Sequence, residues 1–347
     1  MLIGIEQEFV FKDADGTYLD FQSGQYPVFQ SIVDAFPLHP EDAGVFECKS
    51  LESAPKRLYV EGFERYDLHG RLVETTPKGL EIRTLPHSNL GSLVGEFIQS
   101  YRLMATAAAE FGLAPVLTSH HPFRSDVVWP RPLNQTERTL RDETRLAIAT
   151  NAMLAHGMHV NVSMEGHGEL QLEDLRQKLN GYLHFMVPFS FSSPFTNGTA
   201  FGGLSWRNHK RAEGRQLVQL EERKGLFLIQ FRGYDACGDD ALLRALLVLF
   251  RAVLLSPRLR DRAPRQNAEA IRRAAMLGFA DPAIRAGAGE ILAAARQVVA
   301  DEKDALELLG GMLAMNDSYA ARMKADHARD GDIMTAISDR YRLGNRV

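Results

Sequence analysis

Cysteine is scarce in this sequence. The 347 residues include two cysteines, Cys48 and Cys237, which lie far apart and form no C-x-x-C motif. This spacing argues against a disulfide framework and against a structural zinc site, and it suits a reduced, cytoplasmic setting. We interpret Cys237 as a small buried packing residue rather than as a nucleophile.

Long apolar runs and an excess of one charge are also missing. No stretch of about 18 uncharged apolar residues occurs, and the nearest approach, 241–255, is interrupted by Arg244 and Arg251. The first residues lack a basic segment followed by an apolar one, so neither a signal peptide nor a membrane span is expected. With 40 basic and 44 acidic residues the net charge is -4. This balance gives no reason to expect nucleic acid or an anionic membrane as partner, and small-molecule chemistry stays open.

The sequence does contain a recurring arrangement of two polar side chains within a strand-like run. Residues two apart on a strand point to the same face of a sheet. The four pairs are Glu6 and Glu8, Glu81 and Arg83, His159 and Asn161, and Gln230 and Arg232. Neighbouring carboxylates repel each other unless a cation lies between them, and hard ions such as Mg²⁺ or Mn²⁺ prefer oxygen ligands. Together the pairs predict one polar sheet face on which metal ligands and arginines converge.

Some of these residues have simpler interpretations. The first pair, taken alone, would more often be the solvated face of an edge strand. Glu47 and Glu61 lie in strand-like segments and are further candidate carboxylates, although solvent-facing alternation is the favoured interpretation. His121 fits a site residue and a hydrogen-bonded structural histidine equally well.

Elements can be placed around these pairs. Strands are expected over 45–49, 57–61 and 114–118, and helices over 31–36, 92–111, 136–154 and 172–186. A β-rich run at 67–74 leads through Pro77-Lys78-Gly79 to the Glu81 strand, which predicts a hairpin. Segment 124–135 lacks periodicity, so we interpret it as a surface loop and a candidate lid.

The last third of the chain is expected to be helical. Asp239 is a predicted cap for a helix over 241–255, and Asp281 with Pro282 opens another. No strand-like segments interrupt this region. Its helices are therefore expected to cover one side of the sheet.

A loop rich in glycine, hydroxyl and basic residues covers 192–211. Backbone N–H groups approach an anion closely where no Cβ intervenes, so such a loop can contact phosphate. Its spacing matches no P-loop, however. An ordinary polar loop is the favoured interpretation.

The ordered motifs resemble those of the glutamate–cysteine ligase family, in particular its compact carboxylate–amine ligase branch. They cover roughly residues 3–240 and read, in order, G-I-E-Q-E, L-E-I-R-T, H-P-F, G-M-H-V-N-V, S-S-P-F-x-x-G and I-Q-F-R-G-Y-D. The resemblance implies an α+β, glutamine-synthetase-like fold with a curved, mainly antiparallel sheet and helices on its outer side. It implies one catalytic domain over 1–347, made of a sheet-bearing core (1–238) and a helical C-terminal part (239–347).

The resemblance also implies a reaction. ATP and Mg²⁺ (or Mn²⁺) would serve as cofactors. The γ-carboxylate of glutamate, or of a related acid, would be phosphorylated by ATP, and an amine would then displace phosphate from the acyl phosphate to give an amide. The partners would be small-molecule substrates. The apolar helices leave a homo-oligomer open, since they could cover the core or form a subunit interface.

Residue roles follow from the matched motifs. Glu6, Glu8 and Glu81 look like the metal carboxylates, His159 like the histidine that coordinates the metal near the nucleotide, and Arg232 like the arginine that neutralises the transferring phosphoryl group. The resemblance also implies that substrate or ATP would be contacted by Arg83, Asn161, Ser205 and Arg207.

One position departs from the family pattern. Gln230 stands where the family usually has a glutamate two residues before the arginine. A glutamine can offer its carbonyl oxygen to a hard cation, but it lacks the full negative charge. Three outcomes stay open: fewer tightly held ions, substitution by another carboxylate such as Glu47 or Asp235, or reduced or lost activity in a non-catalytic paralogue that binds nucleotide or amino acid.

Overall fold

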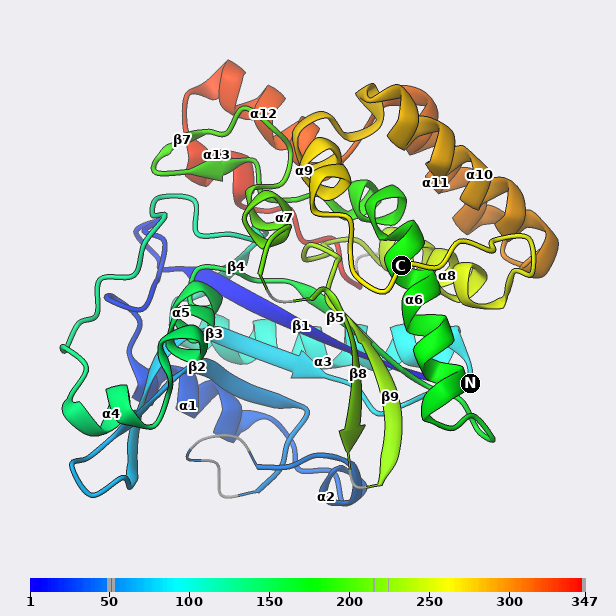
Figure 1. The fold of residues 1–347 in the computed structure, drawn as a ribbon. Coiled ribbons are helices and arrows are strands. Elements are labelled where there is room, and N and C mark those ends of the chain that lie inside the picture. The colour runs from blue at the N-terminus through cyan, green and yellow to red at the C-terminus, as the bar shows by residue number, and fades with distance from the viewer. Residues whose placement is uncertain (49–50, 52–53, 215, 224, 345–347) are drawn as a thin grey trace.

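A curved antiparallel sheet forms the centre of the molecule in the computed structural model, which describes residues 1–48, 51, 54–214, 216–223 and 225–344. Within these residues the sheet has seven strands in the order β2-β3-β1-β5-β9-β8, and β4 pairs with the end of β1 (Figure 1). The strands are β1 (Leu2–Lys12), β2 (Leu58–Tyr66), β3 (Leu72–Arg83), β4 (Ala114–Val116), β5 (Met158–Ser163), β8 (Val218–Arg223) and β9 (Leu226–Phe231). The fold class expected from the sequence is confirmed.

The two faces of the sheet differ in polarity, as the alternation along β1 requires. Ile3, Ile5 and Phe9 point into the hydrophobic core, whereas Glu6 and Glu8 point to the opposite face. A one-residue slip would exchange the two sets, so burial of the apolar face fixes the register. The register in turn fixes which polar residues meet.

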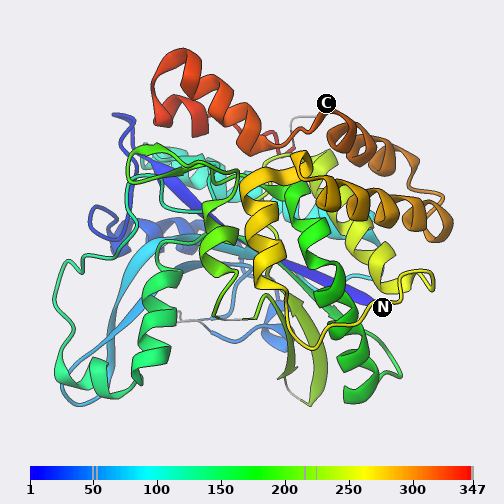
Figure 2. The same cartoon turned by 45° about the horizontal axis from the view of Figure 1, so that its top comes forward.

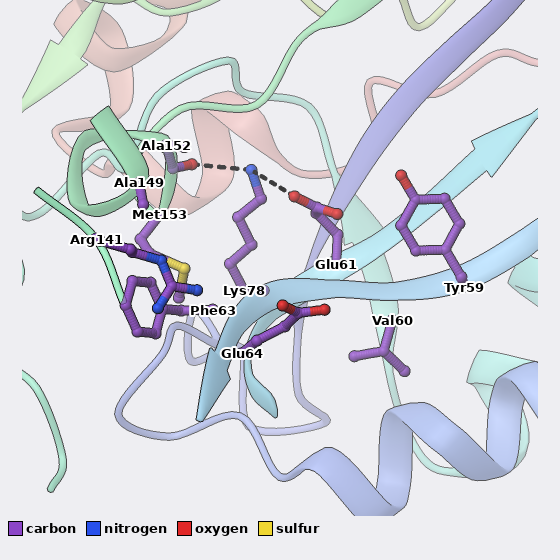
Figure 3. Close-up of a pocket in the computed structure, with 11 residues that line it drawn as sticks. Tyr59, Val60, Glu61, Phe63, Glu64, Lys78, Arg141, Ala149, Ala152 and Met153 are labelled. Carbon is purple, nitrogen blue, oxygen red and sulfur yellow. Dashed lines mark hydrogen bonds and ion pairs between the residues drawn. The ribbon is translucent and has the colours of Figure 1, made fainter. Parts of the chain in front are cut away.

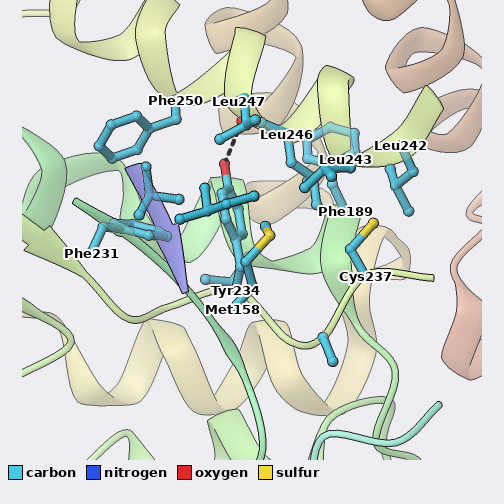
Figure 4. Packing of buried hydrophobic residues seen from close by; sticks show 14 of the residues in the cluster. Met158, Phe189, Phe231, Tyr234, Cys237, Leu242, Leu243, Leu246, Leu247 and Phe250 are labelled. Carbon is cyan, nitrogen blue, oxygen red and sulfur yellow. Dashed lines mark hydrogen bonds between the residues drawn. The ribbon is translucent and has the colours of Figure 1, made fainter. Parts of the chain in front are cut away.

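Helices cover the apolar face. Helix α1 (Tyr26–Ala35) packs on β2 and β3, α3 (Leu90–Glu110) on β1 and β3, and α6 (Glu169–Met186) on β8 and β9. Helix α8 (Asp240–Leu255) packs on α3 and α6. Figure 4 shows Phe231 of β9 beside Phe250 of α8, and the Tyr234 hydroxyl, which donates a hydrogen bond to the carbonyl oxygen of Leu246 (3.1 Å).

Predicted caps mark the actual helix starts. The side chain of Asp239 accepts a hydrogen bond from the N–H of Leu242 at the start of α8, and Asp281 caps α10 (Pro282–Val298) with Pro282 in its first turn. The remaining C-terminal helices are α9 (Ala268–Leu277), α11 (Lys303–Met315), α12 (Tyr319–Asp330) and α13 (Ile333–Ile337). The helical C-terminal third is therefore confirmed.

The placement of these C-terminal helices differs from the expectation. Only α8 joins the helices that cover the sheet, whereas α10 and α11 pack on α8 and form a further layer (Figure 2). The apolar residues of α8 are buried on nearly all sides, which is why a second helical layer is needed. Among the described residues, none of the helices combines the length and the apolar character needed to cross a bilayer.

Two expected elements near the N-terminus are wrong. Segment 45–49 is no strand, because α2 (Asp42–Val45) ends there and Phe46 to Cys48 are irregular; Lys49 lies outside the described residues. The hairpin turns at Asp67–Arg71 instead of Pro77–Gly79. Strand β3 continues through Gly79 because that residue has no Cβ, which would lie 2.0 Å from the carbonyl oxygen of Phe9.

The expected helix over 136–154 is two helices. Helix α4 (Gln135–Thr139) ends before Asp142, which caps α5 (Glu143–Ala152) by accepting a hydrogen bond from the N–H of Arg145. Helix α5 contains no buried residue. Asp142 between the two helices acts as a cap, and this local signal outweighs the continuous apolar spacing.

Candidate active site

The polar face of the sheet is the floor of a cavity of about 770 Å³, which we call the main cavity. Cross-strand register assembles the four polar pairs there. Glu6 lies opposite both Arg83 and His159, and Glu8 lies opposite Glu81. Eight of the ten residues predicted for the site line the main cavity: Glu6, Glu8, Glu81, Arg83, His159, Asn161, Gln230 and Arg232.

The first cluster of potential metal ligands is Glu6, Glu81 and His159. Each offers one ligand atom, and these atoms lie within 4.8 Å of one another. Burial lowers the pKa of His159 to about 4, although its contact with Glu6 opposes that shift. His159 is therefore neutral near pH 7 and keeps a nitrogen lone pair for a metal.

The second cluster is Glu8, Glu61 and Glu81, with ligand atoms within the same 4.8 Å. Lys78 lies beside it, with its Nζ 2.6 Å from Glu8 Oε1 and 3.8 Å from Glu61 Oε1. Glu8 also accepts a hydrogen bond from the N–H of Gly157 at 2.7 Å. Burial opposes ionisation of Glu8, but Lys78 and the nearby histidines outweigh it and lower its pKa to about 2.

Glu81 belongs to both clusters and has the opposite electrostatic environment. Burial raises its pKa well above the usual range, and the charges of Glu61, Glu8 and Glu6 raise it further. Without a cation, this environment favours the protonated form of Glu81 more than water does. A divalent cation beside it would favour the ionised form and relieve the repulsion, and a donor set of carboxylates with one imidazole fits Mg²⁺ or Mn²⁺.

Guanidinium groups gather at the Glu6 end of the main cavity. Arg223 Nη1 lies 3.6 Å from Glu6 Oε1, and Arg232 Nη2 lies 3.5 Å from Glu221 Oε1. Burial opposes ionisation of Glu6, but hydrogen bonding to His159 and the charges of His159, Arg223 and Arg232 lower its pKa to about 2. This end of the cavity is suited to an anion such as a polyphosphate.

Gln230 links these groups through its amide. The side-chain oxygen accepts a hydrogen bond from Arg232 Nε at 2.6 Å, and its Nε2 donates one to Glu6 Oε2 at 3.2 Å. Of the proposed substitutes, Glu47 lines the main cavity but belongs to neither metal cluster, and Asp235 does not line the cavity. The additional carboxylate that the structure does bring into a cluster is Glu61.

Arg83 and Asn161 line other parts of the floor. The guanidinium of Arg83 lies over the rings of Phe46 (4.5 Å) and Tyr59 (4.8 Å), and its Nε donates to the carbonyl oxygen of Lys56. Within the described residues, the buried Oδ1 of Asn161 has no hydrogen-bond partner. It is thus a free acceptor at the cavity wall.

Ser205 and Arg207 do not reach the main cavity. Both are fully buried in a network centred on Asp235, which accepts hydrogen bonds from the hydroxyls of Ser193 (2.9 Å) and Ser205 (3.0 Å). Arg207 Nη1 lies 3.4 Å from Asp235 Oδ1, so its charge is already paired. Ser205 also caps the short helix α7 (Trp206–Arg211). These residues shape the protein interior, and the polar-loop interpretation of 192–211 fits better than phosphate contact.

Three residues of the site were missed or undervalued. Glu61 was given a solvent-facing interpretation, and Lys78 and Arg223 were not singled out. The sequence signal for Glu61 is its spacing of two from Tyr59 in a strand-like run. The pairing of these two residues with Glu81 and Gly79 of β3 is seen only in the structure. Lys78 carried no signal, since its Pro-Lys-Gly context is typical of a turn.

Two further sequence interpretations have structural answers. Cys237 is buried, and burial raises the pKa of its thiol to about 12, so it is a packing residue. His121 Nε2 lies 3.2 Å from Asp20 Oδ2, and neither cavity described here includes it. This contact favours the structural interpretation of His121.

Comparison with known proteins gives independent findings. No family model matches the chain. The protein named "Putative glutamate–cysteine ligase 2" of Ruegeria pomeroyi is 32% identical over 130 residues, which are 37% of this chain and 32% of that protein. The match thus spans about a third of that relative's length.

Two solved structures share the fold. The glutamate–cysteine ligase of Francisella tularensis in complex with AMP aligns with a TM-score of 0.63 at 13% identity, over 98% of this chain and 87% of that one. A bifunctional glutathione synthetase from Pasteurella multocida aligns with a TM-score of 0.64 at 11% identity, over 98% of this chain and 51% of that one. At such identities the likeness concerns the fold. The partial sequence match and the shared fold agree with the resemblance seen in the motif series.

Proposed function

We propose that this protein is an ATP-dependent ligase that joins a carboxylate to an amine and forms a γ-glutamyl-type amide. One observation carries the proposal: two carboxylate clusters share Glu81 on one sheet face, and guanidinium groups gather at one end of the same cavity. Phosphoryl transfer needs this combination of cation sites and fixed positive charge. The names of the similar proteins, which are ligases or synthetases, point the same way.

The cofactors of the proposed reaction are ATP and Mg²⁺ or Mn²⁺. Glu6, Glu81 and His159 would hold one ion, and Glu8, Glu61 and Glu81 a second. When bound, such ions would polarise phosphoryl and carboxylate oxygens and neutralise their charge. The AMP complex of the structural neighbour supports nucleotide binding, which we assign to the main cavity.

The chain's own side chains would orient the reactants. Arg232 and Arg223 would face the phosphoryl oxygens at the Glu6 end, where charge develops in the transition state. Asn161 would offer its free Oδ1 to a donor on the nucleotide or the substrate. The acid would lie at the Glu8 end, away from Arg223 and Arg232, because Lys78 accompanies the carboxylates there.

Two steps complete the reaction. A carboxylate oxygen of the acid attacks the γ-phosphorus of ATP, the bond to the β-phosphate oxygen breaks, and ADP leaves. The amine then attacks the acyl carbon, the bond to the phosphate oxygen breaks, phosphate leaves, and the amine nitrogen loses a proton. The nature of the amine stays open.

Gln230 favours a second candidate, a paralogue that binds nucleotide or amino acid without joining them. Its amide supplies no charge where the related ligases are expected to have a glutamate. This candidate predicts binding without turnover, whereas the ligase predicts an amide product.

The test is incubation with ATP, Mg²⁺, L-glutamate and a panel of amines, followed by mass spectrometry. Glu81→Gln removes the carboxylate shared by both clusters and should lower amide formation at least a hundredfold. Glu74→Gln is the matched control, since Glu74 lies exposed on the same strand. An amide that forms equally well in Glu81→Gln would refute the assigned site, and no amide with any acid and amine in the wild type would refute the ligase.

A further inference from the structure

A smaller cavity of about 250 Å³, which we call the side chamber, lies between strand β2 and helix α5. Its wall combines Phe63, Ala149 and Met153 with four charged residues, Glu61, Glu64, Lys78 and Arg141. Figure 3 shows Lys78 between Arg141 on one side and Glu61 on the other. The mixture of both charges with apolar surface is what a small zwitterion would require.

The side chamber adjoins the main cavity. Tyr59, Glu61, Lys78 and Ala152 line both. Lys78 Nζ donates to the carbonyl oxygen of Ala152 at 2.9 Å and lies 3.8 Å from Glu61, so these groups form the boundary (Figure 3). A molecule in the side chamber would therefore meet the second carboxylate cluster at Glu61.

Arg141 is the distinctive group of the chamber. Its guanidinium lies over the rings of Phe63 (4.3 Å) and Tyr66 (5.6 Å). Within the described part of the chain, its buried Nη1 has no hydrogen-bond partner. A buried guanidinium nitrogen without an acceptor is costly, and a ligand carboxylate would satisfy it.

The opposite charge is available across the chamber. Glu61 contacts Lys78, and Glu64 accepts a hydrogen bond from the Tyr66 hydroxyl at 2.6 Å. An ionised carboxylate has about four acceptor positions and can accept from more than one donor. An ammonium group in the chamber would therefore meet negative charge while Arg141 binds a carboxylate.

We propose that the side chamber binds the charged head group of an amino-acid substrate, with Arg141 pairing its carboxylate. The inference rests on the proposed ligase function for the identity of the reaction, but binding itself does not depend on turnover. The amino acid is either the acid that is phosphorylated or the amine that accepts the acyl group. Both share the head-group chemistry, and the kinetic arm of the experiment distinguishes them.

The first arm measures binding without catalysis. Thermal unfolding of the full chain is followed in the presence of Mg²⁺ and a non-hydrolysable ATP analogue. Each sample also contains either an amino acid, L-glutamate or another standard one, or the methyl ester of that amino acid. A bound amino acid should raise the wild-type Tm, and its ester, which lacks the carboxylate charge, should not. Arg141→Gln should abolish the difference. Arg145→Gln is the matched control, because Arg145 is an exposed arginine at the start of α5.

A second variant tests the chamber without removing charge. Ala149→Leu fills it from α5 and should prevent the same stabilisation, whereas Ala147→Leu changes an exposed alanine of the same helix and should not. If Arg141→Gln and Ala149→Leu both bind the amino acid as the wild type does, or if acid and ester stabilise the wild type equally, the proposal is overturned.

The second arm measures KM. Loss of a charged hydrogen bond should raise the KM of one amino-acid substrate about tenfold to a hundredfold in Arg141→Gln, with the KM of ATP unchanged. The substrate affected, donor of the carboxylate or of the amine, names the occupant. An increase in the KM of ATP alone would refute the assignment. If the protein binds the amino acid through Arg141 but makes no amide, the proposed binding site stands and the proposed ligase function is refuted. The failures of the two proposals are therefore distinguishable.

Discussion

Replacing Gln230 by glutamate tests whether the departure from the family pattern weakens a metal site. In the wild type the amide donates to Glu6 Oε2 at 3.2 Å and accepts from Arg232 Nε at 2.6 Å. The glutamate would still accept from Arg232. It would lose the donation to Glu6 and place a second carboxylate beside it.

The cost without metal can be estimated from these contacts. Two like charges about 4 Å apart repel by about 4 kcal/mol at an effective dielectric constant near 20, and the new ion pair with Arg232 offsets a similar amount. What remains is the lost hydrogen bond to an ionised group, about 2 kcal/mol. We therefore expect Gln230→Glu to lower the metal-free free energy of unfolding by about 2 kcal/mol.

With a metal the sign reverses. The two carboxylates become ligands, so the Kd of Mg²⁺ or Mn²⁺ should fall by at least the same free energy, a factor of about 30. Urea unfolding across a metal titration measures both quantities, because a ligand of the folded state stabilises it by RT ln(1 + [L]/Kd). Gln135→Glu, an exposed change of equal charge, is the control. An unchanged metal Kd together with unchanged metal-free stability would show that Gln230 does not face a cation.

Two other perturbations test the fold. Burial, reinforced by the charge of Arg273, lowers the pKa of His184 from 6.5 to about 4. The neutral side chain therefore contributes to the free energy of unfolding above pH 6.5, and this contribution is lost as the pH falls toward 4. His184→Phe should remove about 2 kcal/mol of the loss in unfolding free energy between pH 6.5 and 4.5. Equal pH profiles for His184→Phe and wild type would contradict the argument. In chemical denaturation, Phe231→Ala should lower the free energy of unfolding by about 3–5 kcal/mol. Leu226 on the same strand is 68% exposed, so Leu226→Ala should lower it by well under about 1 kcal/mol. Similar losses in both variants would refute the burial of this face.

The parts of the fold that local signals specify were predictable. The alternation in β1 gave both the strand and the face of Glu6 and Glu8, and Asp239 and Asp281 marked two helix starts. Errors arose where a local signal was ambiguous. Gly79 looked like a turn residue, yet it serves the close crossing of β3 and β1 at Phe9, a tertiary contact that no local pattern contains.

The site divides in the same way. Eight of the ten predicted site residues came from the strand pairs, and all eight line the main cavity. A spacing of two is enough to place side chains on one face of a strand. Ser205 and Arg207 were assigned by motif position alone. Their composition suits an anion site, but Asp235, 28 residues beyond Arg207, supplies the partner that buries them. A long-range ion pair of this kind cannot be read from a single sequence.

Glu47 and Glu61 show why register rather than composition decides which carboxylates can act. Both seemed equivalent in the sequence, yet Glu61 lies on β2 two residues from Tyr59, which pairs with Glu81, and Glu47 follows a short helix outside the sheet. Membership of the sheet brings Glu61 into a cluster with Glu8 and Glu81.

The shared position of Glu81 has a consequence for two cations. Burial and the surrounding carboxylates raise the pKa of Glu81 well above its usual range in the metal-free protein, so cation binding there would favour loss of a proton from Glu81. Glu81 would belong to both proposed cation sites, so its ionised form would serve both. On the proposed function, metal affinity should therefore rise with pH through Glu81, whereas Lys78 lowers the pKa of Glu8 and favours its ionised form.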